Sequence, residues 1–166
     1  MKDTLCFFLL GVALTLAIMS CFMLLTGAYA EDWEETVYVL CNPESYVNIR
    51  EKPSKRSARA GFAYCGDDFR TDGKIRHGFL HVFAGTENGD GWISTGFIVY
   101  SQPEKVDDTW VIDSNGRVAA RSTICGKRNR WLKNGKEITV YYVAEVAVTN
   151  YGFVDARYVS PVGIEP

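Results

Sequence analysis

With 166 residues and a formal net charge of −2, the chain has room for one ordinary domain or two very small ones. The near-neutral charge gives no support to nucleic acid as the main partner. Aromatic residues make up 13% of the chain, with 15 glycines and only five prolines, a composition that argues against disorder and suits small β-barrels.

Residues 1–30 have the pattern of a secretory signal peptide. Residues 5–25 carry no charge, and Ala28-Tyr29-Ala30 forms an A-x-A cleavage site directly before an acidic segment. We therefore expect cleavage after Ala30 and a mature protein that is extracellular or at the cell envelope. Two alternatives stay open. The apolar run is long enough to anchor an uncleaved chain in a membrane, and the sequence before Cys21 loosely resembles a lipobox.

After this segment, short β-branched or aromatic runs alternate with turn-forming residues, without a sustained 3.6-residue apolar period. The pattern predicts an all-β fold with short strands. Residues 51–61 and 122–130 are polar and basic and are expected to form long exposed loops, whereas 101–108 contains a charge run and is expected to be a linker. The expected strands cover residues 37–40, 46–50, 79–83, 138–143 and 146–148; residues 62–64 and 69–71 flank Gly66, and 109–112 opens the second half.

Three blocks recur in the same order in the two halves of the chain, which indicates two copies of one module. The first block has the pattern Val-x-x-Arg, and the last has a glycine, an aromatic residue and a β-branched residue. The last block predicts a short strand, one tight helical turn and a second strand, with the glycine allowing two backbones to approach closely. Two unrelated β-hairpins with similar turns are the alternative. The matched pairs are Val47-Asn48-Ile49-Arg50 with Val118-Ala119-Ala120-Arg121, residues 62–69 with 131–138, and Gly91-Trp92-Ile93 with Gly152-Phe153-Val154.

Over residues 36–162, these blocks resemble the bacterial SH3-like (SH3b) domain. The resemblance implies two small SH3-like β-barrels in tandem after the N-terminal hydrophobic signal segment. The second copy departs from the family pattern, because Phe153 stands in place of the tryptophan and Ala119 in place of the usual asparagine. The expected organisation is a first barrel over residues 36–100, a linker over 101–108 and a second barrel over 109–162.

Three cysteines, Cys41, Cys65 and Cys125, lie outside the signal segment. Export permits a disulfide, and we predict a Cys41–Cys65 bond because both residues end strands that can lie side by side. Buried or idle thiols are the alternative. His77 and His81 are the only histidines, both expected as surface polar residues, and no CxxC spacing indicates a metal site. We therefore expect no catalytic residue, no metal and no cofactor.

The candidate ligand-binding residues are of two kinds. Basic residues crowd the two long loops of a chain that is acidic overall, which favours a positive rim for anionic wall polymers, with a merely solvated loop as the alternative. Aromatic residues where loops and strands meet suit a peptide-binding shelf, whereas Trp92, Phe97, Phe153 and Tyr158 are expected in the core. The candidates are Tyr46, Arg50, Phe79, Tyr100, Trp110, Arg121, Lys127, Arg128 and Arg130.

Members of the SH3b family usually occur on secreted or cell-surface proteins, often beside a cell-wall hydrolase, and bind wall peptides or other envelope ligands. The resemblance therefore implies an exported, non-enzymatic binding protein whose partner is peptidoglycan peptide or an anionic wall polymer. Two alternatives are kept. One is a membrane-tethered sensor or scaffold that binds another envelope protein. The other is a cysteine hydrolase that pairs Cys65 with His77 or His81.

Overall fold

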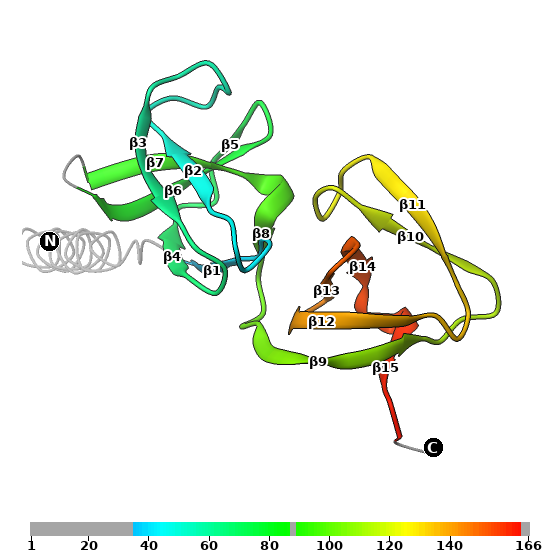
Figure 1. The fold of residues 1–166 in the computed structure, drawn as a ribbon. Helices are drawn as coiled ribbons and strands as arrows, with labels where there is room; N and C mark the ends of the chain where they lie inside the picture. Colours follow the sequence, from blue (N-terminus) through cyan, green and yellow to red (C-terminus); the bar gives the residue numbers. More distant parts are fainter. Residues whose placement is uncertain (1–34, 87–88, 164–166) are drawn as a thin grey trace, which may run out of the picture. The chain divides into compact units, whose positions relative to one another are not determined.

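The structure, a computed structural model, describes residues 35–86 and 89–163, which form β-strands, turns and two short 3₁₀ helices (Figure 1). The predicted all-β fold is thus confirmed. The signal-peptide, anchor and lipoprotein predictions concern residues 1–30, which lie outside the described residues. Within the described ranges, no helix has the length and apolar character needed to cross a membrane.

The first sheet is built from the first half of the described chain. Its strand order is β3-β2-β7-β6-β4-β1-β8, and the short strand β5 pairs with β6 beside this path. Its elements are β1 (Glu35–Val39), β2 (Val47–Arg50), β3 (Arg59–Ala63), β4 (Asp68–Thr71), β5 (Ile75–Arg76), β6 (Phe79–Thr86), β7 (Gly89–Ser94), η1 (Thr95–Phe97) and β8 (Ile98–Val99).

The second sheet is built from the second half, in the order β11-β10-β14-β13-β12-β9-β15. All of its neighbouring strands pair antiparallel. Its elements are β9 (Glu104–Ile112), β10 (Arg117–Arg121), β11 (Arg128–Lys133), β12 (Glu137–Val143), β13 (Val146–Thr149), β14 (Gly152–Asp155), η2 (Ala156–Tyr158) and β15 (Val159–Pro161).

The two sheets have the same strand order. We leave out β5 and number the remaining seven strands of each half in chain order. Both sheets then have the order third, second, sixth, fifth, fourth, first, seventh. Neither order closes into a ring among the described residues, because the end strands β3 and β8, and likewise β11 and β15, do not pair with each other. The expected closed barrels are therefore absent from the described pairing, and what the structure establishes is two open antiparallel sheets.

The recurring sequence blocks occupy matching positions in the two sheets. Arg50 pairs with Trp92 where β2 meets β7, and Arg121 pairs with Phe153 where β10 meets β14. Each closing strand also leads into a 3₁₀ turn, η1 or η2, as the sequence predicted. The backbone arrangement of the first and last blocks is thus duplicated.

Gly152 illustrates why the closing strand begins with glycine. Its φ is +110°, and a Cβ atom there would clash with the carbonyl oxygen of Arg121. At the matching position, a Cβ on Gly91 would clash with the side chain of Ile49. Only a residue without a side chain lets the two strands approach this closely, as the sequence predicted.

Alternate strand residues fill a hydrophobic core in each sheet. In β2, for example, Val47 and Ile49 are buried, whereas Asn48 and Arg50 are only partly covered. A further cluster contains residues of both sheets, and the ring centroids of Phe97 and Phe153 lie 6.1 Å apart beside it. The two halves therefore share buried apolar surface within one compact unit. The buried members of the shared cluster are Leu40, Val99, Val148 and Phe153.

The expected linker over residues 101–108 is shorter than the sequence suggested. Glu104 pairs with Val143 and Asp108 with Val140, so β9 begins inside the expected linker. Residues 104–108 of β9 pair with β12 only. Strand β15 pairs with the other edge of β9, but only from Trp110 onward. The charged side chains of residues 104–108 are solvent-exposed, so this part of the strand shows no apolar periodicity in the sequence. The two expected loops are also shorter, since β3 begins at residue 59 and β11 at residue 128.

Candidate binding cleft

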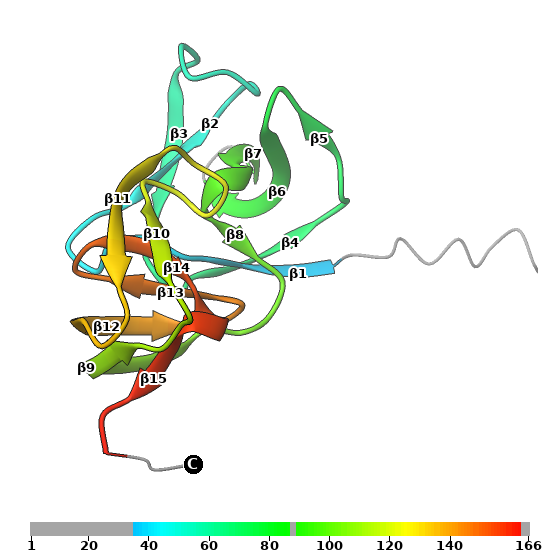
Figure 2. The same ribbon diagram turned by 90° about the vertical axis from the view of Figure 1, so that its right-hand side faces the viewer.

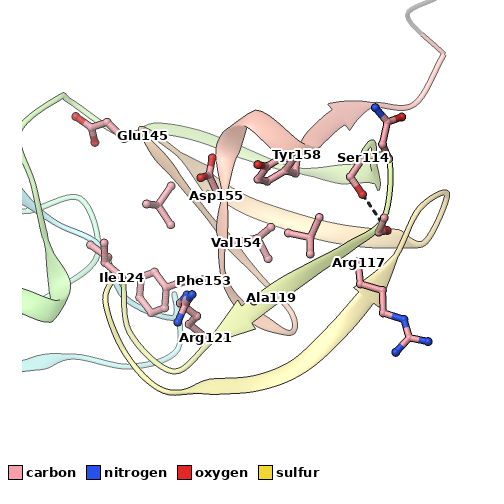
Figure 3. A pocket seen from close by; sticks show the side chains of 14 residues that line it. Ser114, Arg117, Ala119, Arg121, Ile124, Glu145, Phe153, Val154, Asp155 and Tyr158 are labelled. Atoms are coloured by element: carbon pink, nitrogen blue, oxygen red, sulfur yellow. Dashed lines mark hydrogen bonds between the residues drawn. The ribbon is translucent and has the colours of Figure 1, made fainter.

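The second sheet carries a cleft of about 490 Å³ (Figure 3). The turn before β10 forms one end, β10 and β14 form the walls, and η2 and the start of β13 close the other side. In β10, Arg117, Ala119 and Arg121 share the face of the strand opposite the core and line the cleft, and the buried Val118 between them also belongs to the lining. Its lining comprises Ser114, Asn115, Gly116, Arg117, Val118, Ala119, Arg121, Ile124, Glu145, Val146, Phe153, Val154, Asp155 and Tyr158.

The floor of the cleft is apolar. Phe153 and Val154 are buried in β14, and Ile124 from the β10–β11 loop is partly buried beside them. The backbone N–H of Ile124 donates to the carbonyl of Gly96, which holds the loop in place at 2.9 Å. An apolar floor with a few polar groups around it is the usual composition of a small-ligand site.

Acidic groups stand on one side of the cleft. Asp155 caps η2 by accepting a hydrogen bond from the backbone N–H of Arg157, and its carboxylate also accepts from the Arg157 guanidinium at 3.0 and 2.7 Å. These hydrogen bonds from Arg157 lower the pKa of Asp155. The carboxylate of Glu145 accepts from the backbone N–H of Ser101 at 3.2 Å. The Asp155 carboxylate is therefore ionised near neutral pH.

A positive charge stands on the other side. Arg121 lies beside Phe153 in Figure 3, and its guanidinium donates to the carbonyl of Gly126 at 3.0 Å. The guanidinium of Arg117 extends away from the other labelled side chains (Figure 3). Neither arginine has a carboxylate within ion-pair distance among the described residues. The cleft thus offers an apolar floor between an anionic wall and a cation.

The structure brings only one predicted ligand residue, Arg121, into this cleft. Phe79 is buried at 6% exposure, so it cannot form a binding shelf, and Trp110 packs against the second core. Tyr46 and Tyr100 are half-exposed, at 50% and 54%. The remaining predicted residues lie outside it: Arg50 on β2, with Lys127, Arg128 and Arg130 around the β10–β11 hairpin.

Sequence reasoning missed Ser114, Glu145 and Asp155. Ser114 belongs to a run of turn-forming residues, Asp113-Ser114-Asn115-Gly116, a pattern that indicates a turn and no ligand site. Asp155 occupies the N-cap position of η2, a recognisable signal in the sequence Asp-x-Arg. Nothing in the sequence indicates that these separate turns meet at one cleft.

The two candidate disulfide cysteines are neighbours and are free thiols in this structure. The backbone N–H of Cys41 donates to the Sγ atom of Cys65 at 3.2 Å, from positions after β1 and β3. The hydrogen bond between the thiols lowers the pKa of Cys65 and raises that of Cys41. The disulfide remains a prediction, which a non-reduced tryptic digest analysed by mass spectrometry tests directly. Cys125 is a free, exposed thiol.

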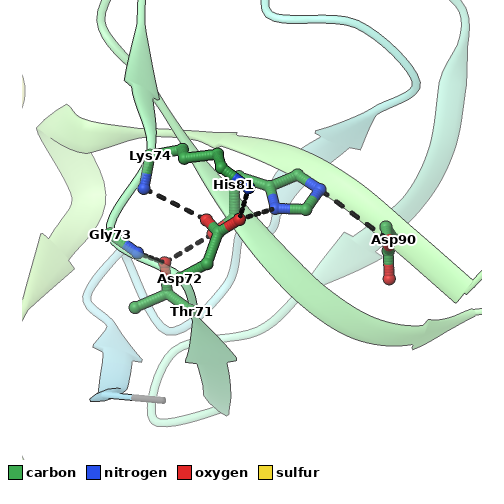
Figure 4. A network of polar contacts seen from close by, with 6 residues as sticks. All are labelled: Thr71, Asp72, Gly73, Lys74, His81 and Asp90. Carbon is green, nitrogen blue, oxygen red and sulfur yellow. Dashed lines mark hydrogen bonds and ion pairs between the residues drawn. The ribbon is translucent and has the colours of Figure 1, made fainter. Parts of the chain in front are cut away.

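His81 belongs to a polar network on the first sheet rather than to the open surface (Figure 4). Its side chain is 16% exposed, and its ring packs 5.0 Å from Trp92. The Nδ1 atom lies 3.1 Å from the Asp72 carboxylate as an ion-pair contact, although its geometry is not that of a hydrogen bond. Lys74 Nζ lies 2.6 Å from the same carboxylate. The expectation of a surface histidine was wrong for His81, because neighbouring rings cover it, and right for His77.

Burial by itself would raise the pKa of Asp72, but hydrogen bonds from Lys74 and the charges of Lys74 and His81 lower it to about 2. No hydrogen bond links Cys65 to either histidine in the described part of the chain. Among the described residues, no group of three His, Cys, Asp or Glu side chains is placed to hold a metal ion.

No family model and no curated protein matches this chain. Two solved structures from Trichomonas vaginalis are similar to it. NlpC1 has 15% identity and a TM-score of 0.35, with 79% of this chain and 47% of that chain covered. NlpC2 has 13% identity and a TM-score of 0.35, with 82% of this chain and 52% of that chain covered. The chain therefore spans about half the length of these proteins, and a likeness this distant assigns no activity.

Proposed function

We propose that the chain is an exported, non-enzymatic binding protein made of two SH3-like modules, over residues 36–100 and 109–162. Its ligand is a cell-wall peptide or another envelope ligand, and it acts outside the cytoplasm. Three observations support the proposal. Residues 1–30 have a signal-peptide pattern, the two sheets share one strand order, and the sequence blocks resemble those of the SH3b family.

The cleft on the second sheet is the observation that carries the proposal. A wall peptide has free amino and carboxylate groups separated by short apolar side chains. The carboxylates of Asp155 and Glu145 suit the amino group, and Arg121 suits the carboxylate. Ile124, which is partly buried, supplies an apolar contact in the same cleft. Neither a cysteine nor a histidine lines the cleft.

Calorimetric titration with soluble wall fragments tests this assignment. Fragments with the peptide stem should bind, and the same glycans without the peptide should not. We expect Arg121→Gln to weaken peptide binding by about tenfold, roughly 1.4 kcal/mol, because a charged hydrogen bond to the ligand is lost. Arg50→Gln is the matched control. Arg50 occupies the equivalent position and donates to the carbonyl of Ser57 in its own loop, but it does not line the cleft.

Equal losses in the two variants would contradict binding at the cleft. Binding of stripped glycan as tight as that of the peptide-bearing fragment would contradict a peptide ligand.

The tethered sensor and the hydrolase stay as rivals. The intact mass of the exported protein tests the tethered sensor, because a chain that begins at Glu31 has lost its membrane anchor. For the second, the lowered pKa of the Cys65 thiol is the favouring observation. A wall-hydrolysing activity abolished by Cys65→Ala would replace the binding proposal with an enzymatic one.

A further inference from the structure

Strand β11 forms an open edge of the second sheet. Among the described residues, it is the first strand in the sheet order and pairs only with β10 (Figures 1 and 2). Backbone hydrogen bonds from other turns reach Lys127 and Lys133, at the two ends, but none reaches the residues between them. In an antiparallel strand with one neighbour, alternate N–H and C=O groups point away from that neighbour. The outer edge of β11 therefore presents unpaired backbone donors and acceptors.

A groove of about 290 Å³ follows this edge. Four successive residues of β11 line this groove, from Arg130 to Lys133. Because consecutive strand residues point to opposite faces of a sheet, the lining includes residues from both faces of this edge strand. Lys136 and Tyr151 complete the lining.

Aromatic rings in and beside the groove are covered by cations. The Arg128 guanidinium lies 4.5 Å from the Trp131 ring, and the Arg130 guanidinium lies 4.9 Å from the Tyr151 ring. Lys136 Nζ approaches the same tyrosine at 5.8 Å. Such contacts fix the position of a cation without neutralising it. The side chains are thereby held in place for an anionic partner.

The charge around the groove has one sign. From residue 117 to residue 136 the chain contains no Asp or Glu. Among the described residues, none of the cations in this segment forms an ion pair, whereas Lys74 and Arg157 elsewhere do. Unpaired positive charge of this density favours an acidic ligand. The cations are Arg117, Arg121, Lys127, Arg128, Arg130, Lys133 and Lys136.

We propose that the edge of β11 binds an extended acidic peptide segment of a partner protein, which adds to the second sheet as a further antiparallel or parallel strand. The partner backbone pairs with the free N–H and C=O groups, and its acidic side chains meet Arg130, Lys133 and Lys136. This surface is separate from the cleft, because the two share no lining residue. The proposal therefore does not depend on the wall ligand.

A peptide fits this surface better than a linear polyanion does. Both satisfy the cations, but only a peptide satisfies unpaired backbone groups along the strand. Trp131, at 48% exposure, adds an apolar contact for a side chain of an extended peptide. A polyphosphate chain has no donor for the free carbonyls and no apolar side chain.

Binding of short probes to the exported protein tests the proposal. The probe is a capped, fluorescently labelled hexapeptide of alternating Glu and Val. Its matched forms replace every Glu with Lys, or carry N-methyl groups on the amides of one edge. We expect the acidic peptide to bind and the lysine peptide not to bind. We expect the N-methylated peptide, whose charge is unchanged, to bind at least about tenfold more weakly because strand pairing is blocked.

Variants locate the site. Lys133→Glu and Arg130→Glu should each weaken binding of the acidic peptide by about tenfold or more, because the ligand then meets a like charge. Arg59→Glu is the matched control on β3, the corresponding edge strand of the first sheet, and should leave binding unchanged. Urea unfolding of each variant checks that the fold is intact. If a charge reversal prevents folding, the N-methylated probe still decides the question on the unmodified protein.

Two results would overturn the proposal. Equal affinity for the N-methylated and unmodified acidic peptides would exclude strand addition. Polyphosphate that binds as tightly as the peptide and competes with it fully would identify a polyanion surface in place of a peptide site.

Discussion

Asp72 shows how one carboxylate organises the residues around a covered histidine. It lies between Lys74 and His81; hydrogen bonds from Lys74 and the charges of Lys74 and His81 lower its pKa to about 2. A histidine in the middle of β6 is thereby held under the rings of Phe83 and Trp92. The network stabilises the fold only while Asp72 is ionised.

We expect Asp72→Asn to reduce stability by about 1–2 kcal/mol near neutral pH. The pKa of Asp72 in the folded protein lies below its usual value of 3.8. The contribution is therefore present above about pH 4 and is lost as the pH falls toward 2. Urea unfolding of both proteins from neutral pH downward measures it. A stability difference that stays constant down to pH 2 would contradict an electrostatic origin.

At the scale of elements, the closing strands β7 and β14 have the same backbone arrangement in the two sheets. Each begins near a glycine that touches the neighbouring strand and ends in a 3₁₀ turn. Their aromatic residues differ in environment, however. Phe153 is buried in the shared cluster, whereas Trp92 is only partly buried and packs on His81. The backbone is duplicated and the side-chain packing is not.

Gly152→Ala should destabilise the protein by more than about 2 kcal/mol, because a side chain at φ +110° is strained and meets the Arg121 carbonyl. Gly135→Ala is the control. Gly135 also has a positive φ, +70°, but no atom lies within 4 Å of the added methyl group. It should cost about 1 kcal/mol. Denaturant unfolding compares the two, and equal losses would show that contact with Arg121 is unimportant.

At the scale of the whole described chain, a small apolar cluster connects the two sheets. Phe153 and Val148 of the second sheet pack with Leu40 and Val99, which belong to the first half of the chain. Two small sheets gain stability by sharing buried surface in this way. The two halves should therefore unfold together rather than independently.

Phe153→Ala should cost about 3–5 kcal/mol, the usual loss for a buried aromatic side chain. Because the cluster is shared, amide exchange should accelerate in both sheets, including at Leu40 and Val99. Tyr100→Ala, at a side chain that is 54% exposed, is the control and should change little. Faster exchange confined to the second sheet would show that the halves are independent.

Much of the fold could be predicted from residue patterns, whereas most of the cleft could not. The all-β class follows from β-branched runs and turn residues, which act locally. Val47-x-x-Arg50 and Gly91-Trp92 identify the duplicated strands because each repeats at a fixed place along the chain. Ser114, Glu145 and Asp155 come from three separate turns, and their meeting depends on strand pairing across the sheet.

The sequence by itself determined the strand-forming segments, the duplication and the glycines of the closing strands, because these depend on local conformation and on a repeat visible along the chain. Tertiary structure alone decided that β9 extends into the expected linker, that Phe79 and His81 are covered, and that the sheets share a cluster around Phe153. It also decided that β11 is left with a free edge. Burial and edge position depend on which distant strands become neighbours, and a linear pattern of residues does not contain that information.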